Sequence, residues 1–187
     1  MNNVTIHQSA IVESDKIGEG SKVWAFVHIL KDVFIGKNAN ICDHCFLENG
    51  VKIGDNVTVK CGVWLWDGVE VEDNVFIGPS VAFTNDLFPR SKNVNYDKKS
   101  TLLKEGCSIG ANSTILAGVT IGKYAMFGAG SMVTKNVSDF ELVYGNPILN
   151  KGYVCKCGKK LEFISLKSIC SCGLKYLISN NIVNSEI

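Results

Sequence analysis

The stretch IGKNANICDHCFLENGVKIGDNVTV (residues 35–59) places an aliphatic side chain at every sixth position. These positions are Ile35, Ile41, Leu47, Ile53 and Val59. An amphipathic helix has a period of 3.6 residues and a half-buried strand has a period of two, so neither element explains a sustained period of six. A short unit repeated at a fixed period predicts a stacked repeat architecture.

The period extends in both directions along the chain. Every sixth residue from Ile11 to Phe83 is apolar, and the period resumes at Leu103 and continues to Val133. Two residues before these markers the side chain is often small or β-branched, and glycine often follows the marker, as at Gly36. The repeat therefore covers most of the chain.

Short strands joined by two-residue corners fit this pattern. Side chains alternate between the two faces of a strand, so a marker and the residue two before it both point inward. Three strands and three corners make one triangular coil of about eighteen residues, and such coils stack as parallel strands about 4.8 Å apart. We predict an all-β parallel β-helix over residues 1–147, capped by Met1–Ala10 and by the segment after Val133.

The composition argues against several classes of protein. The chain has 187 residues, with 19 basic and 18 acidic side chains and a net charge of +1. Nucleic-acid binding usually needs a basic excess on one face, so we expect no nucleic-acid partner. No apolar run is long enough to span a bilayer, and the N-terminus has no signal-peptide pattern. We expect a cytoplasmic protein whose eight cysteines are reduced.

The segment VAFTNDLFPRSKN (residues 81–93) is where the period stops. We predict that residues 84–102 form a loop extruded from the stack, because insertions in repeat proteins become loops, often on the binding face. The loop contains Arg90, the single arginine of the chain, whose planar guanidinium suits phosphate or carboxylate. A surface loop without function is the alternative, although long loops in compact domains usually have one.

Three segments carry a resemblance to a known family. The segment GVWLWDGVEVEDNVFIGPSVAFTNDLFPRSKN (residues 62–93) resembles hexapeptide-repeat acyltransferases that acetylate the 3-amino group of nucleotide-linked sugars. GAGSMVTKNV (residues 128–137) and ELVYGNP (residues 141–147) resemble the last coils and the exit segment of that family. The resemblance implies a left-handed β-helix, a homotrimer, and acetyl-CoA bound in the cleft between subunits. It also implies a dTDP- or UDP-linked amino sugar as acceptor and a role in lipopolysaccharide or other surface-polysaccharide synthesis.

The resemblance assigns roles in and beside the loop. Asn85 and Asp86 are the expected catalytic residues: the amide oxygen of Asn85 would accept a hydrogen bond from the sugar amine, and Asp86 would share that role or hold the loop. Arg90 would bind pyrophosphate or a sugar carboxylate, and Trp66 and Asp67 would also contact the substrate. Asn and Asp also favour turns, so a purely structural role is the alternative for Asn85 and Asp86.

The coenzyme is expected to contact small residues of the later coils and one lysine. Lys135 could meet a phosphate of CoA. The other predicted contacts are Ala111, Ala117, Gly118, Ala129 and Gly130. The alternative is that these residues are small because the corners of the coils require it.

The histidines leave one question open. Related acetyltransferases often use a histidine base, and this chain has His7, His28 and His44. His28 and His44 fall on outward or corner positions of the repeat, where a surface role is the simpler interpretation. Their spacing does not suggest the three-nitrogen zinc site of a carbonic-anhydrase-like hexapeptide protein.

The tail, residues 148–187, lacks the six-residue period and contains CKCGKKLEFISLKSICSCG (residues 155–173). Two Cys-x-Cys-Gly segments suggest a zinc-ribbon-like hairpin, because four thiolates satisfy tetrahedral Zn²⁺. The candidate ligands are Cys155, Cys157, Cys170 and Cys172. The spacing is one residue shorter than the usual Cys-x-x-Cys, so a hairpin without metal is the alternative.

Two other functions are compatible with the sequence. The first is a non-catalytic hexapeptide scaffold whose zinc-binding tail contacts a protein. The second is an acyltransferase of the same fold that acts on a different amine or hydroxyl, such as a 4-amino sugar. The residues alone do not choose between dTDP and UDP or decide whether the sugar carries a carboxylate.

Overall fold

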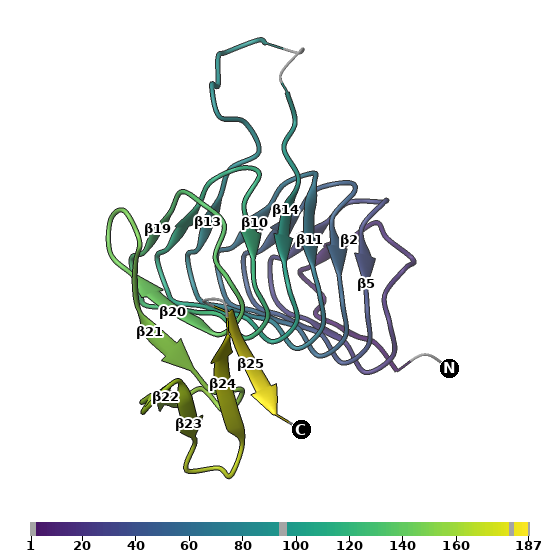
Figure 1. The fold of residues 1–187 in the computed structure, drawn as a ribbon. Coiled ribbons are helices and arrows are strands. Elements are labelled where there is room, and N and C mark those ends of the chain that lie inside the picture. The colour runs from purple at the N-terminus through teal and green to yellow at the C-terminus, as the bar shows by residue number, and fades with distance from the viewer. Residues whose placement is uncertain (1–2, 94–96, 180–181, 187) are drawn as a thin grey trace.

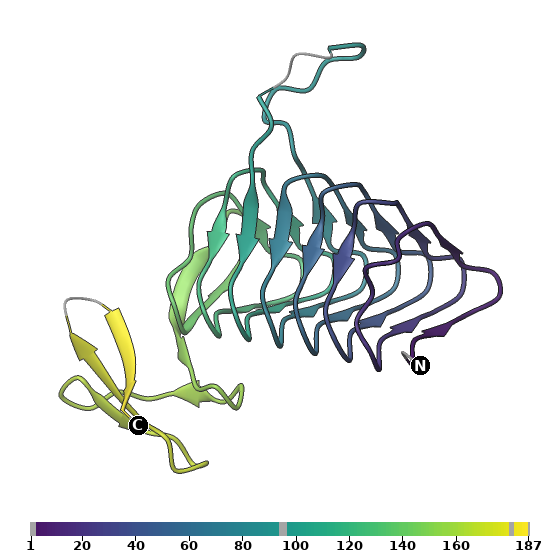
Figure 2. The same cartoon turned by 90° about the vertical axis from the view of Figure 1, so that its right-hand side faces the viewer.

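The protein is a three-sided solenoid with one projecting loop and a small C-terminal appendage (Figures 1 and 2). The computed structural model describes residues 3–93, 97–179 and 182–186, so residues 94–96 of the predicted loop and 180–181 and 187 of the tail lie outside the described residues. All regular secondary structure in these ranges is β-strand. The same ranges contain no helix that could cross a membrane.

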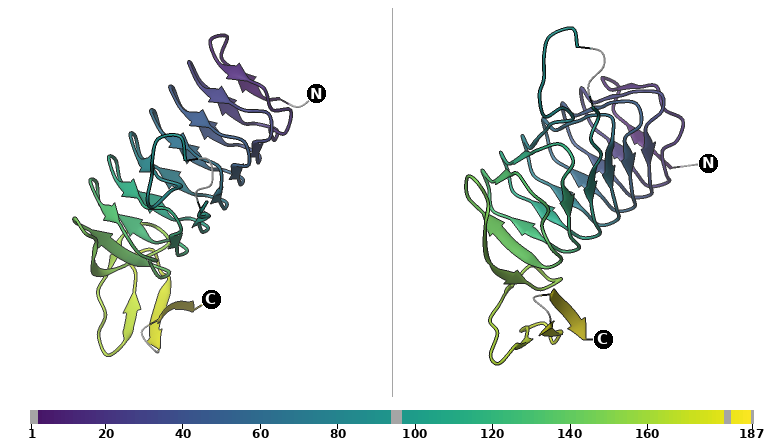
Figure 3. Two further views of the ribbon diagram at one scale, coloured as in Figure 1. Left: turned by 90° about the horizontal axis from the view of Figure 1, so that it is seen from above. Right: turned by 45° about the horizontal axis from the view of Figure 1, so that its top comes forward.

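The three faces of the solenoid are three sheets, called A, B and C here, and each coil visits them in that order. Figure 3 shows the coils stacked side by side along the solenoid. Sheet A contains β1 (Thr5–Ile6), β3 (Lys22–Val23), β6 (Asn40–Ile41), β9 (Thr58–Val59), β12 (Phe76–Ile77), β15 (Ser108–Ile109), β18 (Met126–Phe127), β20 (Glu141–Tyr144), β21 (Leu149–Val154) and β22 (Lys160–Leu161). Sheet B contains β2 (Ile11–Val12), β4 (His28–Ile29), β7 (Phe46–Leu47), β10 (Trp64–Leu65), β13 (Ala82–Phe83), β16 (Thr114–Ile115) and β19 (Met132–Val133). Sheet C contains β5 (Phe34–Ile35), β8 (Lys52–Ile53), β11 (Val69–Val71), β14 (Thr101–Leu103) and β17 (Thr120–Ile121).

The markers of the six-residue period form the core. From Val23 to Val133 every marker is buried, and so are the predicted inward residues two positions before them, from Val33 to Ser131. Where serine occupies the inward position its hydroxyl is satisfied, as at Ser131, whose Oγ donates to the carbonyl oxygen of Gly128 at 2.6 Å. The predicted interior is therefore confirmed for the body of the solenoid.

The first coil departs from the prediction. Ile11 was expected to point inward, but it pairs with the outward-facing His28 and is 58% exposed. The inward residue of β2 is Val12, which pairs with Ile29 and packs against the core. The register of the first strand is therefore one residue later than the period indicates, because only one coil contacts this end of the stack.

The corners are tighter than simple extended connections. Most strands contain only two paired residues, because a turn begins soon after each pair. At most corners the second residue has a positive φ, for example 56° at Asn56 and 85° at Gly118. Asparagine and glycine tolerate this left-handed conformation better than other residues, which explains their frequency there.

Side chains also connect successive coils along the corner between sheets C and A. Gly54 must lack a Cβ, since that atom would lie 2.8 Å from the backbone nitrogen of Asp73 in the next coil. The Asp73 carboxylate in turn accepts a hydrogen bond from the backbone N–H of Asp55 at 2.7 Å. At this corner, glycine allows the coils to approach closely, and the aspartate carboxylate hydrogen-bonds to the backbone of the neighbouring coil.

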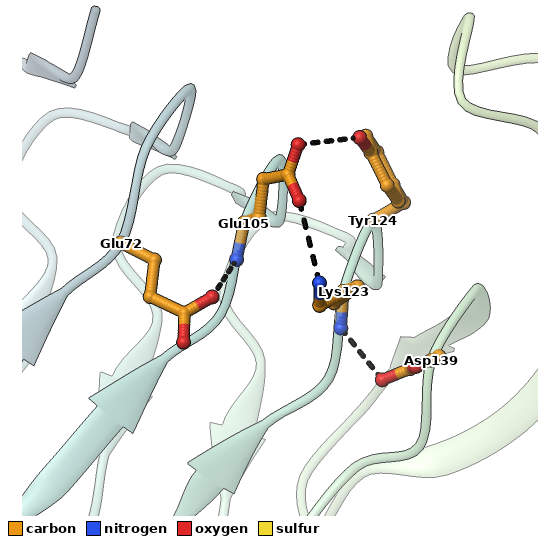
Figure 4. A network of polar contacts seen from close by, with 5 residues as sticks. All are labelled: Glu72, Glu105, Lys123, Tyr124 and Asp139. Atoms are coloured by element: carbon orange, nitrogen blue, oxygen red, sulfur yellow. Dashed lines mark hydrogen bonds and ion pairs between the residues drawn. The ribbon is translucent and has the colours of Figure 1, made fainter. Parts of the chain in front are cut away.

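The same corner carries a polar network in the later coils (Figure 4). The Glu105 carboxylate accepts a hydrogen bond from the hydroxyl of Tyr124 at 2.9 Å and lies 3.4 Å from Nζ of Lys123. The hydrogen bond from Tyr124 lowers the pKa of Glu105. Carboxylate oxygens of Glu72 and Asp139 accept hydrogen bonds from the backbone N–H groups of Glu105 and Lys123. The network links three coils to the segment that leaves the solenoid.

The predicted loop leaves the stack without disturbing it. Val71 pairs with Leu103, and Ile77 pairs with Ile109, so the coils on either side of the insertion remain in register. The insertion connects β13 to β14 at the corner between sheets B and C and projects well beyond the solenoid (Figures 1 and 2). A corner accepts such an insertion because no strand pairing has to be broken.

The C-terminal segment ends the parallel stack. Strand β20 still pairs in parallel with β18, but β21 turns back and pairs with β20 in the antiparallel direction. Strands β23 (Lys167–Ile169), β24 (Lys175–Ser179) and β25 (Ile182–Glu186) form a separate antiparallel sheet, sheet D. A second small core, which includes Phe140 from the last coil and Tyr176 from β24, joins this appendage to the solenoid.

We predict that Ile53→Ala destabilises the protein far more than Lys52→Ala, although the two residues are adjacent in β8. Ile53 is 1% exposed in the core, and truncation of a buried isoleucine costs about 2–5 kcal/mol in the free energy of unfolding. Lys52 points outward and pairs with Glu70 at 3.5 Å in solvent, so its loss should change that free energy by less than about 0.5 kcal/mol. Urea denaturation followed by circular dichroism measures both values, and equal effects would contradict the inward register.

Candidate active site

The outer face of sheet B carries a pocket next to the root of the loop. The pocket has a volume of ≈ 320 Å³. It is lined by β10, β13 and the residues beside them, namely Gly62, Trp64, Trp66, Ser80, Val81, Ala82 and Phe83. Trp64 is 55% exposed, so the pocket presents a large aromatic surface to solvent. Such a surface suits the flat face of a base or the apolar face of a sugar.

Trp66 holds the root of the loop in place. Its indole nitrogen donates a hydrogen bond to the carbonyl oxygen of Phe83 at 2.9 Å. The ring packs at an angle against Phe46 and Trp64, with centroid distances of 5.8 Å and 6.0 Å. Trp66 therefore connects the pocket wall to the residue from which the loop departs.

Polar contacts fasten the two ends of the loop to the corner between sheets B and C. At the start of the loop, Oγ1 of Thr84 accepts a hydrogen bond from the backbone N–H of Ala117 at 2.9 Å. At its end, Nζ of Lys98 lies 2.7 Å from a carboxylate oxygen of Asp67. Asp67 thus contacts the loop directly, which is a structural role beside the substrate contact that we predicted for it.

Asn85 and Asp86 lie at the root of the loop, and both are half-buried. Oδ1 of Asp86 accepts a hydrogen bond from the backbone N–H of Phe88 at 2.8 Å, which is the turn-forming bond expected of aspartate. The backbone N–H of Lys99 lies 3.4 Å from the carbonyl oxygen of Asn85, so the two arms of the loop meet here. In this chain Asp86 shapes the loop, and Asn85 lies where the loop begins.

Arg90 lies farther along the loop and is exposed. Its guanidinium donates a hydrogen bond to the adjacent carbonyl oxygen of Pro89 at 2.9 Å. Among the described residues of the loop, Lys98 is paired with Asp67 and Lys99 with Asp97. Arg90 and Lys92 are exposed cationic side chains, which suit an anionic group such as a pyrophosphate.

The six predicted coenzyme contacts fall on two different corners of the solenoid. Ala117, Gly118 and Lys135 lie at the corner between sheets B and C, which is the corner that carries the loop. Ala111, Ala129 and Gly130 lie at the corner between sheets A and B. The two groups flank strands β16 and β19 of sheet B, so they border one continuous face without forming a single cluster.

Family comparisons agree with this geometry. A family model described as bacterial transferase hexapeptide (six repeats) matches residues 100–135, and another, the hexapeptide repeat of succinyl-transferase, matches residues 27–66. Over 182 residues the chain is 57% identical to the dTDP-3-amino-3,6-dideoxy-alpha-D-galactopyranose 3-N-acetyltransferase of Aneurinibacillus thermoaerophilus. The match covers 97% of this chain and 95% of that enzyme.

This chain belongs to the hexapeptide-repeat sugar N-acetyltransferase family. The membership confirms the resemblance seen in residues 62–93 and the left-handed β-helix that it implies. The match to the Aneurinibacillus enzyme covers 97% of this chain, so it is not confined to the repeat and extends into the tail, where the six-residue period is absent.

Solved structures share the fold of this acetyltransferase at low sequence identity. A hexapeptide transferase family protein from Anaplasma phagocytophilum is 19% identical with a TM-score of 0.53, and the match covers 81% of this chain and 80% of that one. The acetyltransferase domain of PglB from Neisseria gonorrhoeae FA1090, solved with acetyl coenzyme A, is 20% identical with a TM-score of 0.51. That match covers 79% of this chain and 54% of the other.

The histidines of this acetyltransferase lie away from the corner that carries the loop. His44 is at the corner between sheets A and B and stacks on Phe26, with ring centroids 5.0 Å apart. His28 is on sheet B and lies 3.2 Å from the carboxylate of Glu13. His7 contacts Ser9 near the N-terminus. None of these described contacts joins a histidine to a residue of the loop in the same chain.

Two cysteines of the solenoid, Cys45 and Cys107, are packing residues in the core. Burial raises the pKa of Cys45 to about 12 and also raises the pKa of Cys107 well above its ordinary value. Both thiols therefore stay protonated at neutral pH and are poor nucleophiles and poor metal ligands. In the described ranges, the group of side chains suited to a metal is the tail cluster, Cys155, Cys157, Cys170 and Cys172.

Sequence reasoning missed Trp64 and Thr84. Trp64 precedes the buried marker Leu65, so the period already placed this large apolar residue on the outer face, where it is unusual. Thr84 had no comparable signal, since its partner Ala117 is brought next to it only by the stacking of two coils across the insertion.

We predict that Trp66→Phe loosens the root of the loop while Trp64→Phe does not. Phenylalanine keeps the aromatic packing but removes the hydrogen bond to Phe83, which is worth about 0.5–1.5 kcal/mol. Hydrogen exchange measured by mass spectrometry should be several-fold faster at the backbone amide of Thr84, which donates to Ile115. Unchanged exchange in the Trp66 variant, or an equal increase in the Trp64 variant, would show that the indole N–H does not anchor the loop.

Proposed function

We propose that this protein transfers the acetyl group of acetyl-CoA to the 3-amino group of a dTDP-linked 3-amino-3,6-dideoxyhexose. The observation that carries the proposal is the 57% identity, over 97% of this chain, to an enzyme named for that reaction. The nucleotide of that enzyme's substrate favours dTDP over UDP as the nucleotide for this chain. The eight cysteines, all of them free thiols, suit the reducing cytoplasm in which we place the reaction.

The chemistry needs little from the protein beyond positioning. The amine nitrogen forms a bond to the acetyl carbon, the carbon–sulfur bond breaks, and the electron pair leaves on the sulfur of CoA. One amine proton is released and reaches the thiolate through solvent. Because the thioester is already activated, correct placement of a neutral amine can supply much of the rate.

The loop and the pocket divide the recognition of the acceptor. The aromatic wall formed by Trp64 and Trp66 would hold the apolar face of the nucleotide or sugar. Arg90, together with Lys92, would bind the pyrophosphate. Asn85, two positions after the pocket residue Phe83, would accept a hydrogen bond from the amine through its amide oxygen and direct the nitrogen lone pair at the thioester. Asp86 supports this arrangement by forming the turn that follows.

The donor would lie along the later coils. Backbone groups at the two corners that border β16 and β19 are candidates to contact pantetheine, and Lys135 would pair with a phosphate of CoA. Small residues such as Ala117, Gly118 and Gly130 permit close approach of a ligand to the backbone.

We also propose that the active form is a homotrimer in which each site lies between two subunits. Phe26, at the corner between sheets A and B, is 61% exposed, and Trp64, on sheet B, is 55% exposed. Such exposure is unusual for large aromatic side chains of a monomer. The loop extends far from its own solenoid (Figure 2), into the volume that a neighbouring subunit would fill. The two corners that carry the predicted coenzyme contacts would then face each other across subunits.

The function is tested by the release of CoA thiol from acetyl-CoA with defined acceptors. We expect thiol release with a dTDP-linked 3-amino-3,6-dideoxyhexose and at least about 10-fold lower kcat/KM with the UDP-linked sugar, one discriminating contact being worth about 1.4 kcal/mol. Release with a 4-amino sugar alone would assign the chain to another acceptor. No release with any amino sugar would favour the non-catalytic scaffold.

In the same assay Asn85→Ala should lower kcat about 100-fold, the lower end of what a positioned proton-accepting group contributes. Asn49→Ala is the matched control, because Asn49 lies at the same corner in an earlier coil and its Oδ1 only accepts the backbone N–H of Asp32 at 3.1 Å. The control should retain at least half of the wild-type rate. Wild-type turnover by the Asn85 variant would contradict its role in catalysis.

The trimer is tested separately by light scattering coupled to size-exclusion chromatography. We expect a mass three times the 20.4 kDa of one chain for the wild type and for the Asn85 variant. A monomeric protein with full acetyltransferase activity would exclude sites shared between subunits.

A further inference from the structure

The four tail cysteines converge although they come from two separate turns. All four Sγ atoms lie within 4.8 Å of one another. The Sγ atoms of Cys155 and Cys172 are 3.4 Å apart, and those of Cys157 and Cys170 are 3.6 Å apart. A tetrahedral zinc ion with Zn–S bonds of about 2.3 Å requires sulfur–sulfur distances of about 3.8 Å. The spacing of the sulfurs therefore already fits such an ion.

The two turns have the same backbone geometry. In the first turn the N–H of Gly158 donates to the carbonyl oxygen of Cys155 at 2.8 Å. The N–H of Cys155 donates to the carbonyl oxygen of Lys159, also at 2.8 Å. In the second turn the same two bonds, with the same lengths, connect Gly173 to Cys170 and Cys170 to Leu174. Both glycines have a positive φ, 84° and 94°. These are three-residue hairpin turns that end in a left-handed glycine.

This geometry explains the short Cys-x-Cys spacing. A three-residue hairpin turn is tight enough to bring the first and third residues of the segment together without a second intervening residue. Cys157 shows this directly, because its backbone N–H lies 3.5 Å from Sγ of Cys155. The spacing that departs from the usual zinc-ribbon pattern is therefore compatible with convergence of the four sulfurs.

A buried tyrosine supports one of the sulfurs. Tyr176 in β24 is 1% exposed, and its hydroxyl donates to Sγ of Cys155 at 3.1 Å. The same hydroxyl oxygen accepts the backbone N–H of Lys156 at 3.0 Å, which fixes its orientation. Hydrogen bonds to ligand atoms from outside the coordination sphere are a regular feature of metal sites, since they orient the ligand and offset its negative charge.

Two disulfides are the obvious alternative for four neighbouring cysteines. The paired distances of 3.4 Å and 3.6 Å exceed the length of a disulfide, about 2.05 Å, and all four are free thiols. Two disulfides would also not require all four sulfurs to lie within 4.8 Å of one another, as they do here. A single ion explains why each turn contributes one sulfur to each of the short distances.

We propose that Cys155, Cys157, Cys170 and Cys172 bind one structural zinc ion per chain, which fastens the C-terminal appendage to the last coil of the solenoid. Four protein ligands leave no open position, so the ion has a structural role and not a catalytic one. Cys155 and Cys170 belong to the same small core as Phe140 of the last coil. Nζ of Lys156, between two of the ligands, lies 5.1 Å from the ring centroid of Tyr124 in the polar network of Figure 4.

The proposal is tested by metal analysis of the full chain purified under reducing conditions. We expect one zinc per chain in the wild type, and less than a tenth of that in C155S and in C172S. C61S is the matched control, because Cys61 is an exposed cysteine of the solenoid and its replacement should leave the zinc content at one. A wild type that binds no zinc after dialysis against zinc chloride, or zinc retained in both tail variants, would overturn the proposal.

A second measurement needs no variant that could fail to fold. Cobalt(II) added to the metal-free wild type should give the intense ligand-field and thiolate charge-transfer bands of a tetrahedral sulfur site, saturating at one equivalent and displaced by zinc. After chelation and unfolding in urea, which exposes the buried thiols of the solenoid, alkylation without reductant should label all eight thiols. Protection of four thiols would show two disulfides instead. Chelation should also make the appendage sensitive to limited proteolysis while the solenoid resists.

Discussion

The structure depends on the narrow interior that three short strands enclose in every coil. Each face contributes a marker such as Leu65 or Ile77 and a smaller residue such as Val63 or Val75, and all of them are buried. The coils are held at a fixed spacing by backbone hydrogen bonds between parallel strands, so the interior cannot expand to fit a larger side chain. Six residues are the shortest unit that fills one face and turns one corner, which is why the period persists along the chain.

The same constraint leaves the outside and the corners free to vary. Outward positions take part in no interior packing, so sheet B can carry the exposed Trp64 without cost to the core. A corner has no cross-strand partner on its outer side, so it can accept the whole loop between β13 and β14 while Val71 still pairs with Leu103. The candidate active site is therefore built from outward positions and a corner, where substitutions and insertions leave the core packing and the strand pairing unchanged.

The two ends of the solenoid differ in how completely their apolar residues are covered. At the N-terminal end Ile6 and Ile11 remain 48% and 58% exposed. At the C-terminal end Ile148 closes the core, and the appendage adds a second core around Tyr176. A unit as small as this appendage buries little apolar surface, so it gains stability mainly from contacts with the last coil and from any cross-link between its two turns. The proposed zinc ion would supply that cross-link.

Much of the fold could be predicted from the sequence because its period is local. Each marker, such as Ile53, points inward whatever its neighbours in space, so the spacing of residues along the chain was enough to predict the β-helix, its interior and the place of the loop. Ile11 shows the limit of this reasoning: its register depends on pairing with β4, and a single missing neighbour lets the strand shift by one residue.

The candidate site was predictable only as far as its residues are contiguous. The loop residues Asn85 to Arg90 are adjacent in the sequence, and the four tail cysteines are recognisable from two Cys-x-Cys-Gly segments. By contrast, three features arise from coils that stack on one another. These are the contact of Thr84 with Ala117, the pairing of Asp67 with Lys98, and the division of the predicted coenzyme contacts between two corners. The sequence by itself determined which residues face inward, because that follows from the alternation of side chains along a strand. Only the tertiary structure decided which outward residues meet, because that depends on which coil lies above which, and on the insertion that separates them along the chain.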